Sequence, residues 1–345
     1  MAQHYTKEAP LKVFEAFAGI GTQRMALNNL TIPHEVVAIS EIDEYAIKSY
    51  EAIHGKVNNL GDISVLSTQD IPDHDLFTYS FPCQSLSSYG LRGGLERGTG
   101  TTSSLLWDCE RVIKDKRPRY LLLENVKALV NKVNLPYFKE WLTLLEGYGY
   151  TSYYRVINAK DFGVPQNRER VFVVSILDDD TPYQFTEPTP LTTSFSHYLE
   201  SQVDDKYYLS AERVQKELAN KDYRSRVYFG EEPIYLKGSS HIEILGKVYY
   251  TASERFQRAI YGQGSRTVKA GNNDLSVVLL NHQDQSVRIR RLTPLECFRL
   301  MGVNDDDFYK AQGVCSNTQL YKQAGNTIVV QVLEALFSQL NFKSE

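Results

Sequence analysis

Short apolar runs alternate with amphipathic stretches through the first half of the chain. Apolar runs between polar turns are typical of buried strands, and apolar positions every three or four residues are typical of helices. Strands are predicted at residues 11–17, 35–39, 75–80, 120–123 and 170–176. Helices are predicted through Met25 and Leu27 and at residues 43–54, 105–114 and 137–145. This alternation predicts an α/β fold with a parallel sheet.

The pattern changes after Leu177. Aspartates and a proline-rich stretch at residues 178–190 mark a boundary, and the tyrosine-rich residues that follow do not repeat the strand–helix pattern. An apolar stripe from Ile328 to Leu340 then predicts a last helix that covers the first sheet. We therefore expect one domain made of residues 1–180 and 290–345, with a separate lobe at residues 181–289.

Basic residues are unevenly distributed along the chain. The net charge of −4 alone argues weakly against a nucleic-acid partner. Residues 205–299, however, contain 16 Lys and Arg against 11 Asp and Glu, so the remainder of the chain is acidic. A basic segment on an acidic body can supply phosphate contacts, although it is weak evidence when taken alone.

The four cysteines, at positions 83, 109, 297 and 315, form no C-x-x-C pair and have no matching histidine cluster. We therefore expect no metal site. No apolar run is long enough to span a membrane, and the residues after Met1 lack the apolar stretch of a secretory signal. A cytoplasmic protein with reduced thiols and no membrane contact is expected.

A glycine turn, Phe17-Ala-Gly-Ile-Gly21, follows the first predicted strand. Such a turn can bring the backbone close to a nucleotide, although it also occurs as a simple strand–helix connection. Glu41 lies 20 residues after Gly21, where a carboxylate can accept hydrogen bonds from a ribose, and Asp62 lies near the expected end of the third strand. Because Arg24 replaces the third glycine of a dinucleotide site, an adenosine ligand without a pyrophosphate is favoured.

Cys83 stands in Phe81-Pro-Cys-Gln84, directly after a predicted strand. The carboxyl end of a strand is where α/β proteins bind ligands, so a reactive thiol and a structural one are both open from position alone. The glycine-rich loop that follows, with Arg92 and Arg97, suggests either a lid that reaches phosphates or a flexible surface loop.

Two further polar groups follow or precede strands. Glu124 ends an apolar strand, where it could hold a proton or be a satisfied structural carboxylate. Arg168 and Arg170 would share one side of the chain if the segment is extended, and surface ion pairing is the alternative for both.

In this order and spacing, the motifs resemble those of the DNA cytosine-5 methyltransferases. The matching segments begin at Phe17, Glu41, Gly61, Phe81, Glu124, Gln166, Arg291 and Gln323. The resemblance implies a doubly wound, Rossmann-like α/β sheet that binds S-adenosylmethionine, with a smaller inserted target-recognition lobe. Glu15 departs from the family pattern, which usually has Asp at this place.

The resemblance also implies a chemistry and its residues. The Cys83 thiolate would add to C6 of a cytosine flipped out of double-stranded DNA, Glu124 would hydrogen-bond N3, and Arg170, with Arg168, would support O2. The residues expected to hold the cofactor are Phe17, Gly19, Gly21, Glu41, Ile42, Asp62, Ile63, Asn326 and Thr327. Those expected to contact DNA are Gln84, Ser85, Ser87, Arg92, Arg97, Arg266 and Thr267. A monomer without an obligate protein partner is expected.

Three alternatives stay open at this point. An RNA cytosine-5 methyltransferase would share the architecture, although the length of the middle lobe favours a DNA reader. A non-catalytic DNA-binding relative would not need Cys83, Glu124 and Arg170 together. A nicotinamide dehydrogenase would use only the glycine turn and would leave Cys83 and Glu124 unexplained.

Overall fold

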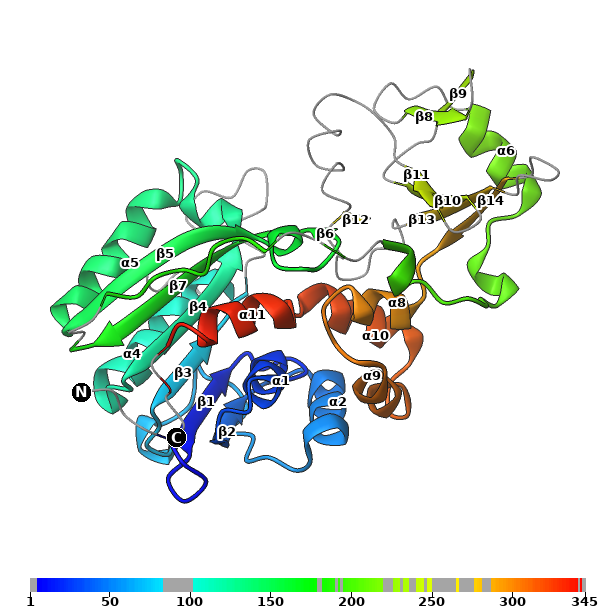
Figure 1. The fold of residues 1–345 in the computed structure, drawn as a ribbon. Helices are drawn as coiled ribbons and strands as arrows, with labels where there is room; N and C mark the ends of the chain where they lie inside the picture. The colour runs from blue at the N-terminus through cyan, green and yellow to red at the C-terminus, as the bar shows by residue number, and fades with distance from the viewer. Residues whose placement is uncertain are drawn as a thin grey trace. The chain divides into compact units, whose positions relative to one another are not determined.

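The structure is a computed structural model that describes residues 5–82, 102–178, 182–189, 192, 195–219, 226–229, 232–235, 240–244, 247–249, 265–266, 276–280, 287–340 and 342 (Figure 1). The chain divides into two compact units, each made of separate stretches. The first comprises Met1–Ile157, Glu169–Glu187 and Val330–Glu345, and the second comprises Asn158–Arg168 and Pro188–Val329. Residues 290–329, which we expected with the catalytic domain, therefore pack in the second unit; the functional division into domains stays a prediction.

A six-stranded sheet forms the centre of the first unit, in the order β2-β1-β3-β4-β7-β5. Its strands are β1 (Leu11–Ala16), β2 (His34–Ser40), β3 (Leu76–Tyr79), β4 (Tyr120–Val126), β5 (Tyr150–Asn158) and β7 (Glu169–Leu177). The five predicted strands are confirmed. Pairs β1–β2, β1–β3 and β3–β4 are parallel. The Rossmann-like α/β expectation is thereby confirmed for this unit.

One strand departs from the parallel sheet that we expected. β7 runs antiparallel to β4, with Tyr120 opposite Ile176 and Glu124 opposite Phe172, so the expectation of an all-parallel sheet was wrong. Between β5 and β7 the chain forms only the 3-10 turn η4 (Ala159–Asp161) and the short β6 (Gln166–Asn167). A parallel neighbour would need a longer crossover, usually helical, so the short return places β7 in the opposite direction.

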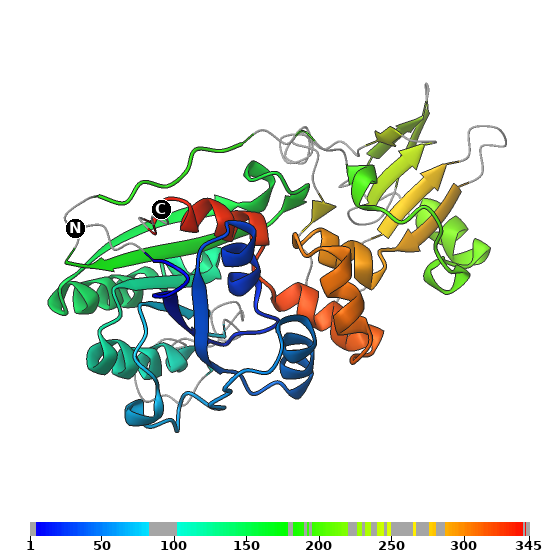
Figure 2. The ribbon, with the colours of Figure 1, turned by 60° about the horizontal axis from the view of Figure 1, so that its bottom comes forward.

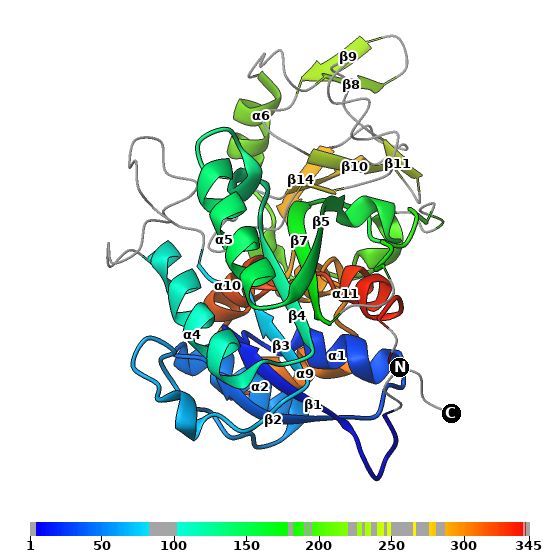
Figure 3. The same cartoon turned by 90° about the vertical axis from the view of Figure 1, so that its left-hand side faces the viewer.

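Helices cover both faces of this sheet. They are α1 (Thr22–Asn29), α2 (Glu44–His54), α4 (Leu106–Lys116), α5 (Leu135–Gly147) and α11 (Val330–Phe337), so the predicted helices are confirmed. Figure 3 shows α4 and α5 on one side of the sheet and α1 with α11 on the other. The carboxamide of Asn29 donates to Glu334 at 2.6 Å, and α11 lies beside α1 in both Figures 1 and 2. The last helix thus covers the first sheet, as its apolar stripe predicts.

The second unit combines small sheets with helices. Its strands form the sheet β11-β10-β13-β14 and the pairs β8-β9 and β12-β6. The strands are β8 (Arg226–Phe229), β9 (Glu232–Tyr235), β10 (Ser240–Ile244), β11 (Lys247–Tyr249), β12 (Ser265–Arg266), β13 (Ser276–Leu280) and β14 (Val287–Arg291). The helices are α6 (Ala211–Ala219), α8 (Pro294–Arg299), α9 (Asp305–Gln312) and α10 (Asn317–Asn326).

A buried ion pair fixes the step from β14 into α8. The guanidinium of Arg290 donates to both carboxylate oxygens of Glu296 at 2.7 Å, and these side chains are 2% and 0% exposed. Thr293 caps α8 through a reciprocal bond pair with Glu296. The Arg291-Leu-Thr-Pro segment noted in the sequence is therefore a rigid structural corner. Within the ranges described above, no helix is long and apolar enough to cross a membrane.

Candidate active site

The turn after β1 holds three residues in the left-handed region of backbone conformation. φ is +56° at Phe17, +57° at Gly19 and +76° at Gly21, which is the N-cap of α1. A Cβ on Gly19 would meet nothing, whereas one on Gly21 would lie 2.5 Å from Cε2 of Tyr50 and 2.6 Å from Nε2 of His54. Gly21 is therefore required both by the backbone and by the close approach of α2.

Glu41 fastens this turn to the end of β2. Oε2 of its carboxylate accepts the amide of Gly19 at 2.8 Å, and Oε1 accepts the amides of Ile42 and Asp43 at 2.9 Å. These bonds orient a half-buried carboxylate beside the glycine turn. Ile42 next to it is 73% exposed, an unusual position for a large apolar side chain.

Asp62 lies in a turn rather than at the end of a strand, so that expectation was wrong. Asn59 makes a single β-bridge with Ile39, and the third strand of the chain begins only at Leu76. The Asn59 carboxamide bonds the backbone of Glu41 on both sides, at 3.2 and 3.1 Å, and also accepts the amide of Gly61. Asn59 thereby brings the Glu41 and Asp62 segments together, although Asp62 itself is exposed.

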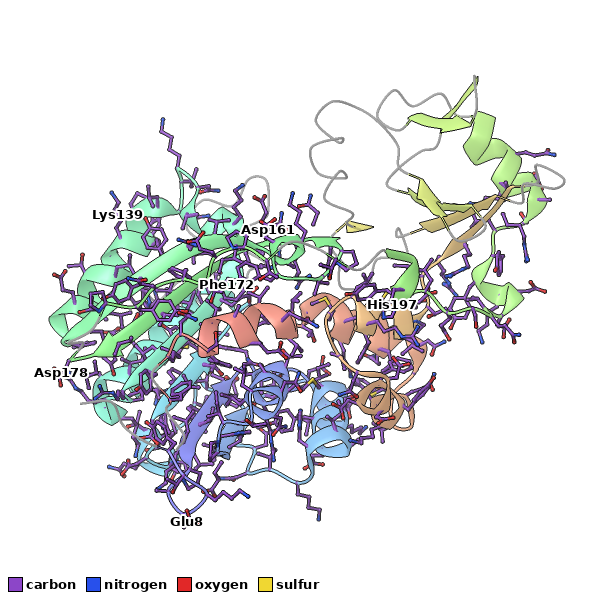
Figure 4. The ribbon with its side chains drawn as sticks, in the orientation of Figure 1. Glu8, Lys139, Asp161, Phe172, Asp178 and His197 are labelled. Carbon is purple, nitrogen blue, oxygen red and sulfur yellow. The ribbon has the colours of Figure 1, made fainter. Side chains whose placement is uncertain are left out.

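Glu124 and Arg170 form an ion pair across β4 and β7. Nε of Arg170 lies 3.2 Å from Oε1 of Glu124, and the side chains are 18% and 11% exposed. Arg170 stands opposite Val126 in the register, and Glu124 stands opposite Phe172, which lies among the packed side chains of the first unit (Figure 4). The antiparallel direction of β7 therefore produces this pairing.

Arg168 has different partners from Arg170. Its Nη2 donates to the carbonyls of Gly325 and Thr327 at 3.0 and 2.8 Å, and the residue is only 4% exposed. β6 ends at Asn167 and β7 begins at Glu169, so the segment is not one continuous strand, which was the condition for the two arginines to share one side. The Arg168 amide instead donates to Oδ1 of Asn158. Arg168 thus binds the backbone at the carboxyl end of α10, where Asn326 and Thr327 lie.

The residues just before Cys83 are tied to the neighbouring strand. The Asn125 carboxamide donates to the Phe81 carbonyl, and the Ser103 hydroxyl donates to the Pro82 carbonyl, both at 3.0 Å. The chain thus enters the cysteine position beside the residue that follows Glu124. Several predicted site residues lie outside the described part of the chain: Cys83, Gln84, Ser85, Ser87, Arg92, Arg97 and Thr267. Arg266 is described by its backbone alone, which pairs with Asn167.

Two cysteines outside the proposed site, Cys109 and Cys297, have a structural environment. Cys109 and Cys297 are fully enclosed, and burial raises the pKa of both thiols. A thiol of raised pKa is a poor nucleophile at neutral pH. Among the residues that the structure describes, no group of three or more His, Cys, Asp or Glu is placed to hold a metal ion.

Comparison with known proteins places this site in a family. The sequence profile described as "C-5 cytosine-specific DNA methylase" matches residues 11–341. The chain belongs to this family. The methylase is 38% identical to the type II methyltransferase M2.ScrFI of Lactococcus lactis subsp. cremoris, over 97% of this chain and 100% of that protein. It is also 34% identical to the type II methyltransferase M.NlaX of Neisseria lactamica, over 95% of this chain and 96% of that one.

Solved structures share the fold of this methylase. The Schizosaccharomyces pombe Dnmt2 methyltransferase superposes with a TM-score of 0.70 at 21% identity, covering 96% of this chain and 98% of that one. The Entamoeba histolytica methyltransferase EhMeth gives 0.68 at 16% identity, covering the same shares. At these identities the likeness concerns the fold.

Sequence patterns missed two polar residues that organise the methylase's site. Asn59 links the Glu41 and Asp62 segments, and Asn125 links the strand of Glu124 to the cysteine turn. Both residues lie close in sequence to motif residues. Their carboxamides, however, bond segments that are distant in the sequence, and a sequence pattern does not show such contacts. The roles assigned to the individual motif residues stay predictions.

Proposed function

We propose that this methylase transfers a methyl group from S-adenosylmethionine to C5 of a cytosine flipped out of double-stranded DNA, through a covalent bond between Cys83 and C6. The observation that carries the proposal is the ion pair between Arg170 and Glu124. Glu124 lies on β4, and the next residue of that strand, Asn125, donates a hydrogen bond to the Phe81 carbonyl, in the turn that leads to Cys83. With the thiol of Cys83, which follows this turn in the sequence, the carboxylate and the cation would supply the groups that activation of cytosine needs.

The steps follow from the electron demand of the ring. C5 of cytosine is a weak nucleophile, so the Cys83 sulfur first donates an electron pair to C6 and the C5–C6 π pair becomes available at C5. Glu124 hydrogen-bonds N3, and the Arg170 guanidinium holds Glu124 in place and stabilises negative charge on the O2 side. S-adenosylmethionine supplies the methyl group as an electrophile. Water then takes the C5 proton, which restores the double bond and expels the Cys83 thiolate; S-adenosylhomocysteine would be the other product.

The glycine turn and Glu41 fit the adenosine part of the cofactor. Gly19 leaves open space where a side chain would stand, and Glu41 is fixed beside it by three backbone amides. An oriented carboxylate suits ribose hydroxyls, and the exposed Ile42 offers an apolar surface to a purine. The exposed Asp62 carboxylate can accept the adenine amino group. The resemblance also assigns cofactor contacts to Asn326 and Thr327, at the end of α10.

Double-stranded DNA is the proposed substrate because the relatives named above are type II methyltransferases, and because the middle lobe is basic. A base within a duplex is unreachable to a thiol, so flipping is required. We propose that residues 181–289 read the target, with Arg266 and Thr267 near the bases and with Arg92 and Arg97 at phosphates. We expect a cytoplasmic monomer.

The test compares wild-type protein with Cys83→Ser and with Cys315→Ser, a half-buried cysteine outside the proposed site. Each receives labelled S-adenosylmethionine and either mixed-sequence duplex DNA or transfer RNA, and nucleosides are then identified. We expect 5-methylcytosine in DNA with the wild type and Cys315→Ser, and none with Cys83→Ser. Label in transfer RNA alone would move the protein to the RNA branch, and DNA binding without transfer would make it a binding module.

A further inference from the structure

A cationic side chain from α4 reaches the turn that carries Asp62 and Ile63. Nη2 of Arg111 donates to the Ile63 carbonyl at 2.8 Å, and Nη1 donates to the Leu66 carbonyl. Arg111 is half-buried, and the turn lies between the single bridge at Asn59 and the 3-10 turn η1 (Thr68–Asp70). A turn with so little regular hydrogen bonding depends on such side-chain bonds for its shape.

Arg111 and Asp62 hold opposite ends of one peptide group. The Ile63 carbonyl accepts from Arg111, while the amide of Ser64, in the same planar unit, donates to Oδ1 of Asp62 at 2.9 Å. The Ser64 hydroxyl adds a second bond to that oxygen at 2.8 Å. A cation at the carbonyl polarises the peptide and strengthens the bond made by its N–H. Arg111 therefore helps to fix the orientation of this peptide, and the peptide in turn fixes the Asp62 carboxylate.

The two carboxylates near Arg111, those of Asp62 and Asp108, also favour a positive charge at this position. Partial burial raises the pKa of Asp108, one turn before Arg111 on α4; the Arg111 charge opposes that shift, and the Asp62 charge adds to it. Two carboxylates therefore share the field of one guanidinium. Without that cation, Asp62 and Asp108 would repel each other, and the exposed Asp62 side chain would turn away.

We propose that Arg111 is a positioning residue for the adenosine end of the cofactor site, because it fixes the Ile63–Ser64 peptide and thereby holds the Asp62 carboxylate toward the ligand. The proposal rests on the proposed function, since it takes S-adenosylmethionine as the ligand. A guanidinium suits this task better than an ammonium because its fork reaches two carbonyls from one rigid plane.

The test is calorimetric titration of full-length variants with S-adenosylmethionine. Loss of a bond to a charged donor corresponds to about a tenfold change in affinity, so Arg111→Ala should raise Kd by about tenfold and Arg111→Lys by less. The matched control is Asp115→Asn. Its carboxylate accepts from Thr68 at 2.6 Å, so it ties the same helix to the next segment without touching the Asp62 turn. The control should keep the wild-type Kd.

A double-mutant cycle separates positioning from general loosening. If Arg111 acts through Asp62, adding Arg111→Ala to Asp62→Ala should change Kd little, and the single Arg111→Ala variant should raise KM for the cofactor while kcat at saturation stays unchanged. Additive losses in Kd, or a wild-type Kd in Arg111→Ala, would overturn the inference. Wild-type protein that binds no S-adenosylmethionine would instead overturn the proposed function. Arg111→Lys carries the test if the alanine variant fails to fold.

Discussion

The carboxamide of Asn125 lies 3.0 Å from the carbonyl oxygen of Phe81, so the segment that enters Cys83 is fastened to the strand that carries Glu124. Asn125 is 3% exposed, and its own Oδ1 accepts the amide of Val126. The same side chain therefore holds both segments. We expect this bond to set how the segment that leads to Cys83 approaches the strand of Glu124.

Asn125→Ala should lower kcat for methyl transfer more strongly than it weakens cofactor binding. The variant should also lose about 1–3 kcal/mol of stability, because a buried carbonyl loses its partner. Asn134→Ala is the matched control, since that buried carboxamide donates to the Ala128 carbonyl at 2.8 Å. Steady-state kinetics and urea unfolding measure the two effects. Equal losses of kcat in both variants would show that stability alone is responsible.

Arg168→Lys and Arg170→Lys should have different kinetic effects. Lysine at 168 cannot reproduce both bonds to Gly325 and Thr327, so the KM for the cofactor should rise while kcat changes little. Lysine at 170 loses the guanidinium beside Glu124, so kcat should fall by about 10²-fold with cofactor affinity preserved. Kinetics at varied cofactor and DNA concentrations distinguish the two. Identical profiles would contradict the separation of roles.

The two glycines of the first turn should tolerate alanine differently. Gly19→Ala meets open space, so only the left-handed backbone opposes it, at about 1–2 kcal/mol. Gly21→Ala carries the same strain and overlaps with Tyr50 and His54, so its loss should be larger by about 1–3 kcal/mol. Chemical unfolding of both variants measures the difference. A smaller loss of stability in Gly21→Ala than in Gly19→Ala would mean that the Tyr50 and His54 side chains move aside at little cost.

Glu15 should make stability depend on pH. Burial raises the pKa of its carboxyl from 4.5 to about 7, although the Tyr50 hydroxyl bond and the Arg24 charge favour the ionised form. The folded protein keeps a proton that the unfolded chain releases at lower pH. The stability from Glu15 is therefore fully present below pH 4.5 and is lost as the pH rises to about 7.

Glu15→Gln keeps a neutral side chain of the same shape, so this loss should disappear. The variant should melt at a higher temperature than the wild type at pH 8, and the two should converge toward pH 4.5. Burial lowers the pKa of His74 to about 4, which has the opposite sign, so the difference between the proteins is the quantity to follow. A constant difference in Tm across this range would contradict the prediction.

The sequence predicted the parallel strands well because their apolar runs are contiguous and their turns are local. It missed β5, where Tyr153, Tyr154 and Arg155 interrupt the apolar pattern on an edge strand that is partly exposed. The direction of β7 was also wrong, since it depends on the preceding connection rather than on the strand's own residues.

The geometry of the candidate site was predictable where it is local to a motif, as for the glycine turn, whose positive φ values the structure confirms. The partners of the site residues were not predictable, because a single sequence gives no contacts between distant segments. The Arg168 side chain binds carbonyls more than 150 positions away, and Arg111 on α4 reaches the Ile63 carbonyl, 48 positions earlier. Asp62 was misplaced for a related reason: a single bridge at Asn59 leaves no strand pattern.

The return of α11 to the first unit sets an order of events during protein synthesis. The ring centroids of Tyr5 and Phe342 lie 6.0 Å apart, and the Leu336 carbonyl accepts a hydrogen bond from the Tyr183 hydroxyl, so α11 and the residues after it pack against segments far earlier in the chain. On the ribosome, α1 is made about 300 residues before α11, as the Asn29–Glu334 bond shows, so its apolar face stays without this partner until those residues have been made. This core is therefore completed only after the Pro188–Val329 stretch of the second unit has been synthesised, which is a non-local contact of the kind that slows folding.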